Sequence, residues 1–175
     1  MKNFLTGIIF TLIVLVGGSF WYLKKGYPSF AADQEPGFIE KHLAMAAVDA
    51  STDRHAPGRK NPITPTDENL LSGAKLYLNH CAGCHGVPSN ADSQFARSFY
   101  PPAPGFFKYA PDLPENQNFY IIEHGIRWTG MPAWNKTLTE TETWQIVTFL
   151  SHIEKLPAAA LKELEPPSAP APSRK

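Results

Sequence analysis

Two cysteines and a histidine form the cluster in this chain with the clearest chemistry. They lie in the run Cys81-Ala82-Gly83-Cys84-His85, and the chain of 175 residues holds no other cysteine. Two cysteines separated by two residues and followed directly by histidine form the covalent attachment pattern of haem c. The two thiols can add across the two vinyl groups of one haem, while the adjacent imidazole binds the iron. The run therefore predicts one covalently bound haem.

Two other uses of a closely spaced cysteine pair fit the sequence less well. A structural zinc site needs four ligands, usually including a second cysteine pair, and this chain has two cysteines in all. A thioredoxin-like redox pair follows a strand that runs into the helix with the cysteines, and no such pattern precedes Cys81. Two free thiols in an exported protein would tend to oxidise.

A second stretch supplies a candidate for the other axial ligand of the iron. Residues 124–134 read His-Gly-Ile-Arg-Trp-Thr-Gly-Met-Pro-Ala-Trp. Together with the cysteine motif, this stretch resembles the monohaem class I cytochromes c of the membrane-anchored bacterial type. The resemblance implies an all-α class I cytochrome c fold, with three to five helices around one covalent haem. It also implies Cys81 and Cys84 as the thioether residues and His85 and Met131 as the iron ligands.

This ligand pair predicts electron transfer rather than catalysis. Histidine and a thioether together leave the iron six-coordinate, and methionine favours ferrous over ferric iron. Met131 has a plainer alternative as a methionine that fills a gap in the core. A haem sensor or a peroxidase-like protein would need an open sixth position, which carbon monoxide binding to the reduced protein would reveal.

Residues 4–23 carry no charged side chain and are long enough to cross a bilayer as a helix. Trp21 and Tyr22 stand at the end of this run, where aromatic rings favour the headgroup level. The sequence predicts an anchor in contact with membrane lipid. A cleaved secretory signal is the alternative, although its apolar core is usually shorter than this run.

Charge does not decide the orientation of this span, because Lys2 and the amino terminus balance Lys24 and Lys25. Covalent haem attachment, as the resemblance implies, takes place outside the cytoplasmic membrane of bacteria. We therefore expect a single-pass protein of the inner membrane with its haem domain in the periplasm.

Composition divides the chain into four predicted parts. Residues 1–25 form the membrane anchor, and residues 26–65 form a periplasmic linker with one short helix near 37–50. Residues 66–156 form the cytochrome c domain, and residues 157–175 form a proline-rich disordered tail.

Helical periodicity predicts the main elements of the haem domain. The first helix begins at the N-cap Thr66. Its Gly73 and Tyr77 match the glycine and aromatic pattern of the family, and the resemblance implies that another helix crosses closely at Gly73. The last helix opens with a capping box at Thr139 and Glu142 and stops at Pro157, beyond which at most a few residues stay helical. The three predicted helices cover residues 66–81, 115–124 and 139–155.

Several residues near the motifs have more than one interpretation. A proline carbonyl within Pro101–Pro104 would accept the second ring proton of His85, as the family implies. Arg127 and Trp128 are candidates to hydrogen-bond a haem propionate, or Arg127 faces solvent. His42 and Met45 are potential iron ligands, although a histidine or methionine on an amphipathic helix more often lies at the surface or in the core. Polar helix residues are the interpretation of His80 and His124.

The charges exclude one class of partner and leave another open. Lysine plus arginine equals aspartate plus glutamate at 16 each, which gives no basis for nucleic-acid binding. The sequence predicts a carrier of single electrons between membrane-bound respiratory or dehydrogenase partners, one a donor and one an acceptor. The alternative is a fixed cytochrome subunit of an oxidoreductase complex.

Overall fold

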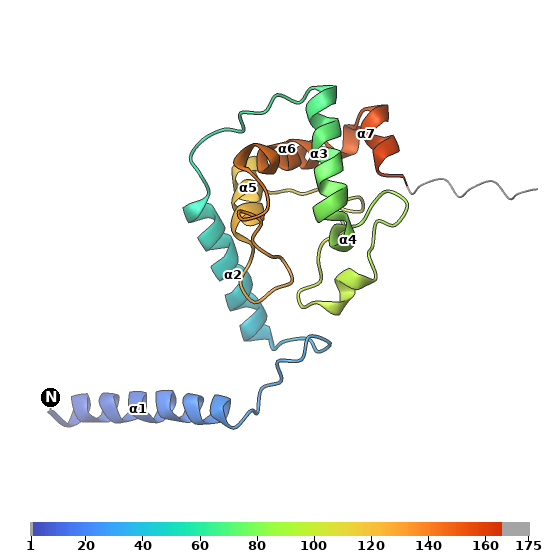
Figure 1. The fold of residues 1–175 in the computed structure, drawn as a ribbon. Helices are drawn as coiled ribbons and strands as arrows, with labels where there is room; N and C mark the ends of the chain where they lie inside the picture. Colours follow the sequence, from blue (N-terminus) through green and yellow to red (C-terminus); the bar gives the residue numbers. More distant parts are fainter. Residues whose placement is uncertain (1, 166–175) are drawn as a thin grey trace, which may run out of the picture. The chain divides into compact units, whose positions relative to one another are not determined.

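The computed structural model describes residues 2–165, and within this range the chain is helical with connecting loops (Figure 1). Seven α-helices and two short 3-10 helices follow one another, and no strand lies among the described residues. The prediction of an all-α fold is confirmed. The chain forms two compact units, one that ends at Gly37 and one that starts at Phe38.

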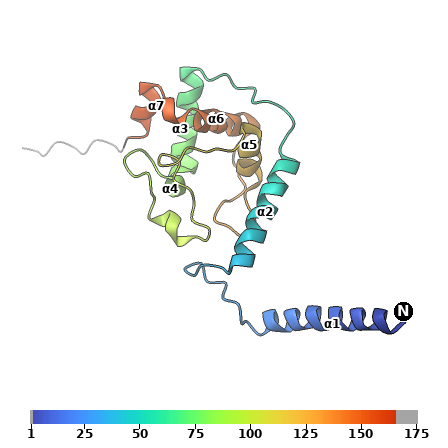
Figure 2. The same cartoon turned by 180° about the vertical axis from the view of Figure 1, so that it is seen from behind.

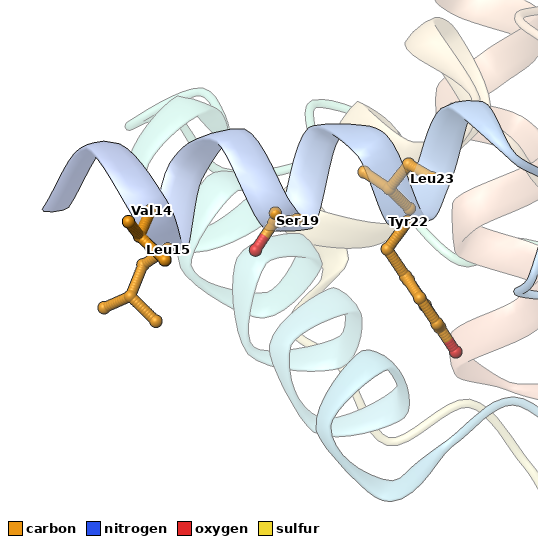
Figure 3. Close-up of a pocket in the computed structure, with 6 residues that line it drawn as sticks. Val14, Leu15, Ser19, Tyr22 and Leu23 are labelled. Carbon is orange, nitrogen blue, oxygen red and sulfur yellow. The ribbon is translucent and has the colours of Figure 1, made fainter. Parts of the chain in front are cut away.

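The first unit contains α1 (Lys2–Lys24), which has the length and composition of a membrane span. Its mean hydropathy is 2.1 and none of its described side chains is buried, as expected for a helix whose apolar surface faces lipid. This helix fits a single-pass membrane anchor. Figure 3 shows side chains from successive turns of α1 around a shallow depression to which no other element contributes: Val14, Leu15, Ser19, Tyr22 and Leu23.

The second unit opens with α2 (Phe38–His55), which runs beyond the expected helix near 37–50. The extra turn packs against α5 (Glu115–His124). The His55 ring stacks on the Tyr120 ring with centroids 6.0 Å apart, and Gln117 Nε2 donates to Asp53 Oδ1 at 3.3 Å. These tertiary contacts stabilise the extra turn, and α2 belongs to the second compact unit, although the sequence predicted a linker over residues 26–65.

Two helices of this unit, α3 (Asp67–His80) and α6 (Glu140–Ser151), pack together and cross (Figures 1 and 2). The predicted caps are present, since Thr66 Oγ1 accepts from a backbone amide and Thr139 forms a complete capping box. At the crossing, a Cβ atom added to Gly73 would lie 2.4 Å from Gln145 O and 2.6 Å from Phe149 Cβ. The helices therefore meet backbone to backbone at this glycine.

The core lies around this crossing and extends to α5. Trp144 stacks on Phe119 with ring centroids 4.1 Å apart, and Tyr77 packs at 5.0 Å from Phe149. Full burial of each such side chain stabilises the fold by about 1.5–3 kcal/mol. The central buried side chains are Tyr77, Phe119, Trp144, Ile146, Val147 and Phe149.

The remaining elements are short and surround the central pair. Between α4 (Ala82–His85) and α5 the chain is loop, apart from the 3-10 helix η1 (Phe95–Ser98). The expected tail from residue 157 differs from the structure: after η2 (Ile153–Lys155), α7 (Ala158–Glu163) packs against α3. This helix forms because Ala160 and Leu164 are buried in the core. Residues 166–175 of that expected tail lie outside the described range.

Candidate functional site

The cysteine motif forms its own helical turn at the end of α3. Cys81 is the C-cap residue of α3, and its amide donates to Tyr77 O at 2.8 Å. The amides of Cys84 and His85 then both donate to Cys81 O, at 3.1 and 2.9 Å. This tight turn brings both cysteines and His85 to the wall of one cavity.

That cavity has a volume of about 650 Å³ and lies wholly within the second unit. The volume falls in the range of about 300–1,000 Å³ that is usual for sites of cofactors and other small molecules. The lining is mostly aromatic and aliphatic, as a porphyrin ring requires. Its larger apolar members are Tyr77, Phe95, Phe99, Phe106, Tyr109, Leu113, Ile121, Ile122, Ile126, Trp134, Ile146 and Leu150.

Neighbours on two sides fix the His85 ring. Its Nδ1 donates to the carbonyl oxygen of Pro104 at 2.8 Å, which identifies the accepting proline within Pro101–Pro104. Its plane stacks on the Phe106 ring, with centroids 4.3 Å apart and an angle of 2°. Burial lowers the pKa of His85, against an opposing effect of the Pro104 carbonyl. Burial thus favours the neutral ring, and because Nδ1 is engaged by Pro104, Nε2 is the nitrogen that remains to bind a metal.

Met131 lies on a tightly closed loop that lines the same cavity. Ile126 N donates to Met131 O at 3.1 Å, and Thr129 Oγ1 donates to Ile126 O at 2.8 Å while accepting from Met131 N at 3.1 Å. Gly125 has φ +67, and a Cβ there would lie 2.7 Å from Met131 O. These contacts give the methionine a defined backbone position.

Burial raises the pKa of the Cys81 thiol to about 12, with a smaller effect from Cys84. The reactive cysteine of a thioredoxin-like pair shows the opposite shift, because its function needs a stable thiolate. The shift at Cys81 therefore speaks against a thioredoxin-like role for this motif.

Tyr77 connects the motif to the core. Its hydroxyl donates to Gly86 O at 2.7 Å, and burial raises its pKa. The loop after His85 is thereby held against α3.

The structure brings the four predicted site residues, Cys81, Cys84, His85 and Met131, to one cavity. It does not bring Arg127 or Trp128 there, since both are exposed and outside the lining, so their predicted propionate contacts find no support. His42 and Met45 also lie outside the lining, as exposed residues of α2.

The polar lining includes residues to which the sequence analysis gave no role in the site. His80, interpreted there as a polar helix residue, lines the cavity, and its ring packs edge-on against Trp134 with centroids 5.2 Å apart. Asp112 and Asn118 line it as well. The position of His80 directly before the cysteine motif was the available signal, whereas Asp112 reaches the cavity through the path of the loop and Asn118 through the position of α5.

Comparison with known families agrees with this geometry. Residues 68–150 match the model of a family described as cytochrome c oxidase, cbb3-type, subunit III. No curated protein gave a significant match to the chain. The matched range contains the cysteine motif, Met131 and all but one terminal residue of each of the crossing helices α3 and α6. Residues 68–150 therefore belong to the class I c-type cytochromes, which bind haem c, and they follow an N-terminal helix that fits a membrane anchor.

Proposed function

We propose that this chain is a membrane-tethered periplasmic monohaem cytochrome c that shuttles single electrons between respiratory or dehydrogenase partners. The observation that carries the proposal is the convergence of Cys81, Cys84, His85 and Met131 on one apolar cavity. Haem c, when bound there, supplies a one-electron ferric–ferrous couple.

Each of the four residues has a distinct role in this proposal. Cys81 and Cys84 hold the cofactor by thioether bonds, and the chain has cysteines for one haem only. His85 would bind the iron through Nε2, since its Nδ1 is engaged by Pro104. Met131 would be the second protein ligand of the iron and would leave no site for a substrate, so the protein would carry electrons without catalysis of its own.

The anchor determines where these electrons are exchanged. α1 confines the haem domain near the membrane, which raises its effective concentration toward membrane-bound donors and acceptors. We place the haem domain in the periplasm of the inner membrane, where covalent haem attachment takes place.

A second candidate function is a fixed cytochrome subunit of an oxidoreductase complex. The description of the matched family favours it, because that family is named for a subunit of an oxidase. Purification of the full-length chain from its native membrane in mild detergent separates the two. A fixed subunit would co-purify in constant ratio with catalytic subunits, whereas a mobile carrier would elute alone.

Haem content tests the proposed cofactor chemistry. The full-length protein should contain one haem per chain by pyridine haemochrome assay, and denaturing gels should show haem stain at the mass of the chain. Replacing both cysteines with alanine should abolish the stain. Extraction of the colour by acid acetone from the wild-type protein would contradict covalent attachment.

A further inference from the structure

We propose that Trp128, together with Arg127, is the contact through which a redox protein partner docks on the haem domain. This inference rests on the proposed electron-transfer function and adds the surface at which transfer takes place. Trp128 lies three positions before Met131, in the loop that presents the proposed iron ligand.

Trp128 combines two features that a structural tryptophan does not normally show. Its side chain is 93% exposed, so it contributes nothing to the core. Its φ is +63, and among residues 2–165 no other non-glycine residue has a positive φ. A bulky residue in this region carries a conformational cost, and such residues concentrate at functional sites.

The surrounding loop holds the backbone of Trp128 in this conformation. Thr129 Oγ1 donates to Ile126 O at 2.8 Å and so bridges the residues on either side of the Arg127–Trp128 pair. Thr129 N donates to the same carbonyl at 3.3 Å. The loop that fixes Met131 therefore also fixes Trp128 on the outer surface.

A haem in the cavity would leave Trp128 accessible, because this residue is not part of the cavity lining. Thr129, Gly130 and Met131 do line it. A protein that covers Trp128 is therefore only one short loop away from the cofactor, which suits electron transfer.

The charge of the loop indicates the chemistry of the partner surface. Residues 125–137 contain the cations Arg127 and Lys136 and no acidic residue. Tryptophan and arginine dominate the binding energy of protein interfaces, especially where an aromatic ring fills a pocket. The partner surface that fits is an apolar depression bordered by carboxylates.

The test compares electron exchange by four full-length holoprotein variants with the wild type. Trp128→Asn removes the ring but keeps a residue that tolerates positive φ. Trp128→Phe keeps an aromatic ring, and Arg127→Gln removes the charge. Leu161→Asn is the matched control, since Leu161 is 41% exposed on α7 and lies outside the cavity lining.

Each pre-reduced protein is mixed in detergent with solubilised native membranes from a strain that lacks this chain, and haem oxidation is followed by stopped flow. We expect Trp128→Asn to slow the reaction by about tenfold or more, and Trp128→Phe by less than about threefold. Arg127→Gln should slow it at low salt only, because charge attraction is screened at high salt. Leu161→Asn should match the wild type.

Oxidation by ferricyanide, the visible spectrum and the midpoint potential should be the same for all five proteins. A wild-type rate for Trp128→Asn with the membranes would overturn the docking proposal while leaving the proposed function intact. Equal slowing with ferricyanide would also overturn it, since the effect would then be on the haem.

The same reaction is then repeated with the proteins and membranes reconstituted in lipid vesicles. If Trp128→Asn is slow in the vesicles but not in detergent, the docking proposal is overturned and Trp128 is assigned to a lipid contact instead. A wild-type protein that reacts with ferricyanide but not with the membranes would contradict the proposed function itself.

Discussion

The two proposed iron ligands are supported by different kinds of neighbours. His85 is held by its side chain, through the bond to Pro104 and the stacked Phe106 ring. Met131 is held through its backbone, by the hydrogen bonds to Ile126 and Thr129. The orientation of the imidazole is therefore built into the loop after the motif, whereas the methionine depends on the closure of its own short loop.

Replacement of Met131 by alanine tests its assignment as a ligand. The oxidised wild-type protein should show the weak near-infrared band of histidine and methionine coordination, and Met131→Ala should lose it. The same variant should have a lower reduction potential and should bind carbon monoxide when reduced, because the thioether favours ferrous iron and blocks the site. An unchanged spectrum would point to another ligand, and Met45→Ala would then be the next variant to examine.

At the scale of helices, the crossing of α3 and α6 depends on one missing side chain. We expect Gly73→Ala to destabilise the fold by about 1–3 kcal/mol, because its Cβ would overlap Gln145 O and Phe149 Cβ. Thermal unfolding followed by circular dichroism measures the effect. Gly58→Ala is the control, since a Cβ at Gly58 meets nothing within 4 Å. Equal stability of the two variants would contradict a close crossing.

The capping box of α6 gives a pH-dependent prediction. Hydrogen bonds from Thr139 lower the pKa of the Glu142 carboxyl in the folded state. The stabilisation is therefore present above the unfolded pKa of about 4.3 and is lost as the pH falls through the lower folded value. Glu142→Gln should reduce the free energy of unfolding at pH 7 by at most about 1 kcal/mol, because the carboxylate is exposed.

Urea unfolding at pH 7 and in the acid range measures this difference. The gap between wild type and Glu142→Gln should shrink toward acid pH. Glu163→Gln, on the short α7, serves as a control for the loss of one carboxylate outside the capping box. A gap that stays constant across the acid range would contradict the proposed role of the Glu142 charge.

Local sequence signals were sufficient for α3, α5 and α6 and for the residues of the motif. Thr66 and the Thr139–Glu142 box each act within one helical turn, so their spacing predicted their structural roles, whereas the role of Gly73 followed from the family resemblance. The loop over residues 86–114 carries no such periodicity. Pro104 and Asp112 reach the cavity only through its tertiary path, which sequence reasoning from spacing does not give.

At the scale of the whole chain, contacts of residues before Thr66 extend the haem domain toward the N-terminus. Arg59 forms an ion pair with Glu140 at 2.7 Å, and Asn61 Nδ2 donates to Thr148 Oγ1 at 2.9 Å. Asn61 Oδ1 also accepts from Ile63 N at 2.9 Å. The segment 57–65 was expected to belong to a linker, yet it lies along α6.

A truncation series tests where the haem domain begins. A holoprotein that starts at Phe38 should unfold at higher temperature than one that starts at Thr66, because the shorter form loses the contacts of Arg59 and Asn61. We expect a loss of about 1–3 kcal/mol, since Thr148 is buried and would lose a hydrogen-bond partner. Both forms should keep the same visible spectrum. Equal melting temperatures would restore the expected boundary at residue 66.

The close approach at Gly73 has a consequence for the speed of electron exchange. A crossing that meets backbone to backbone leaves little room for α3 and α6 to slide, and protein interiors are in any case barely compressible. The motif follows directly from α3, so a rigid crossing would hold the motif in place when a bound iron changes its oxidation state. A small nuclear rearrangement lowers the activation barrier for electron transfer. Under the proposed function, the glycine in the middle of α3 would thus help to keep the reorganisation energy low without touching the cofactor.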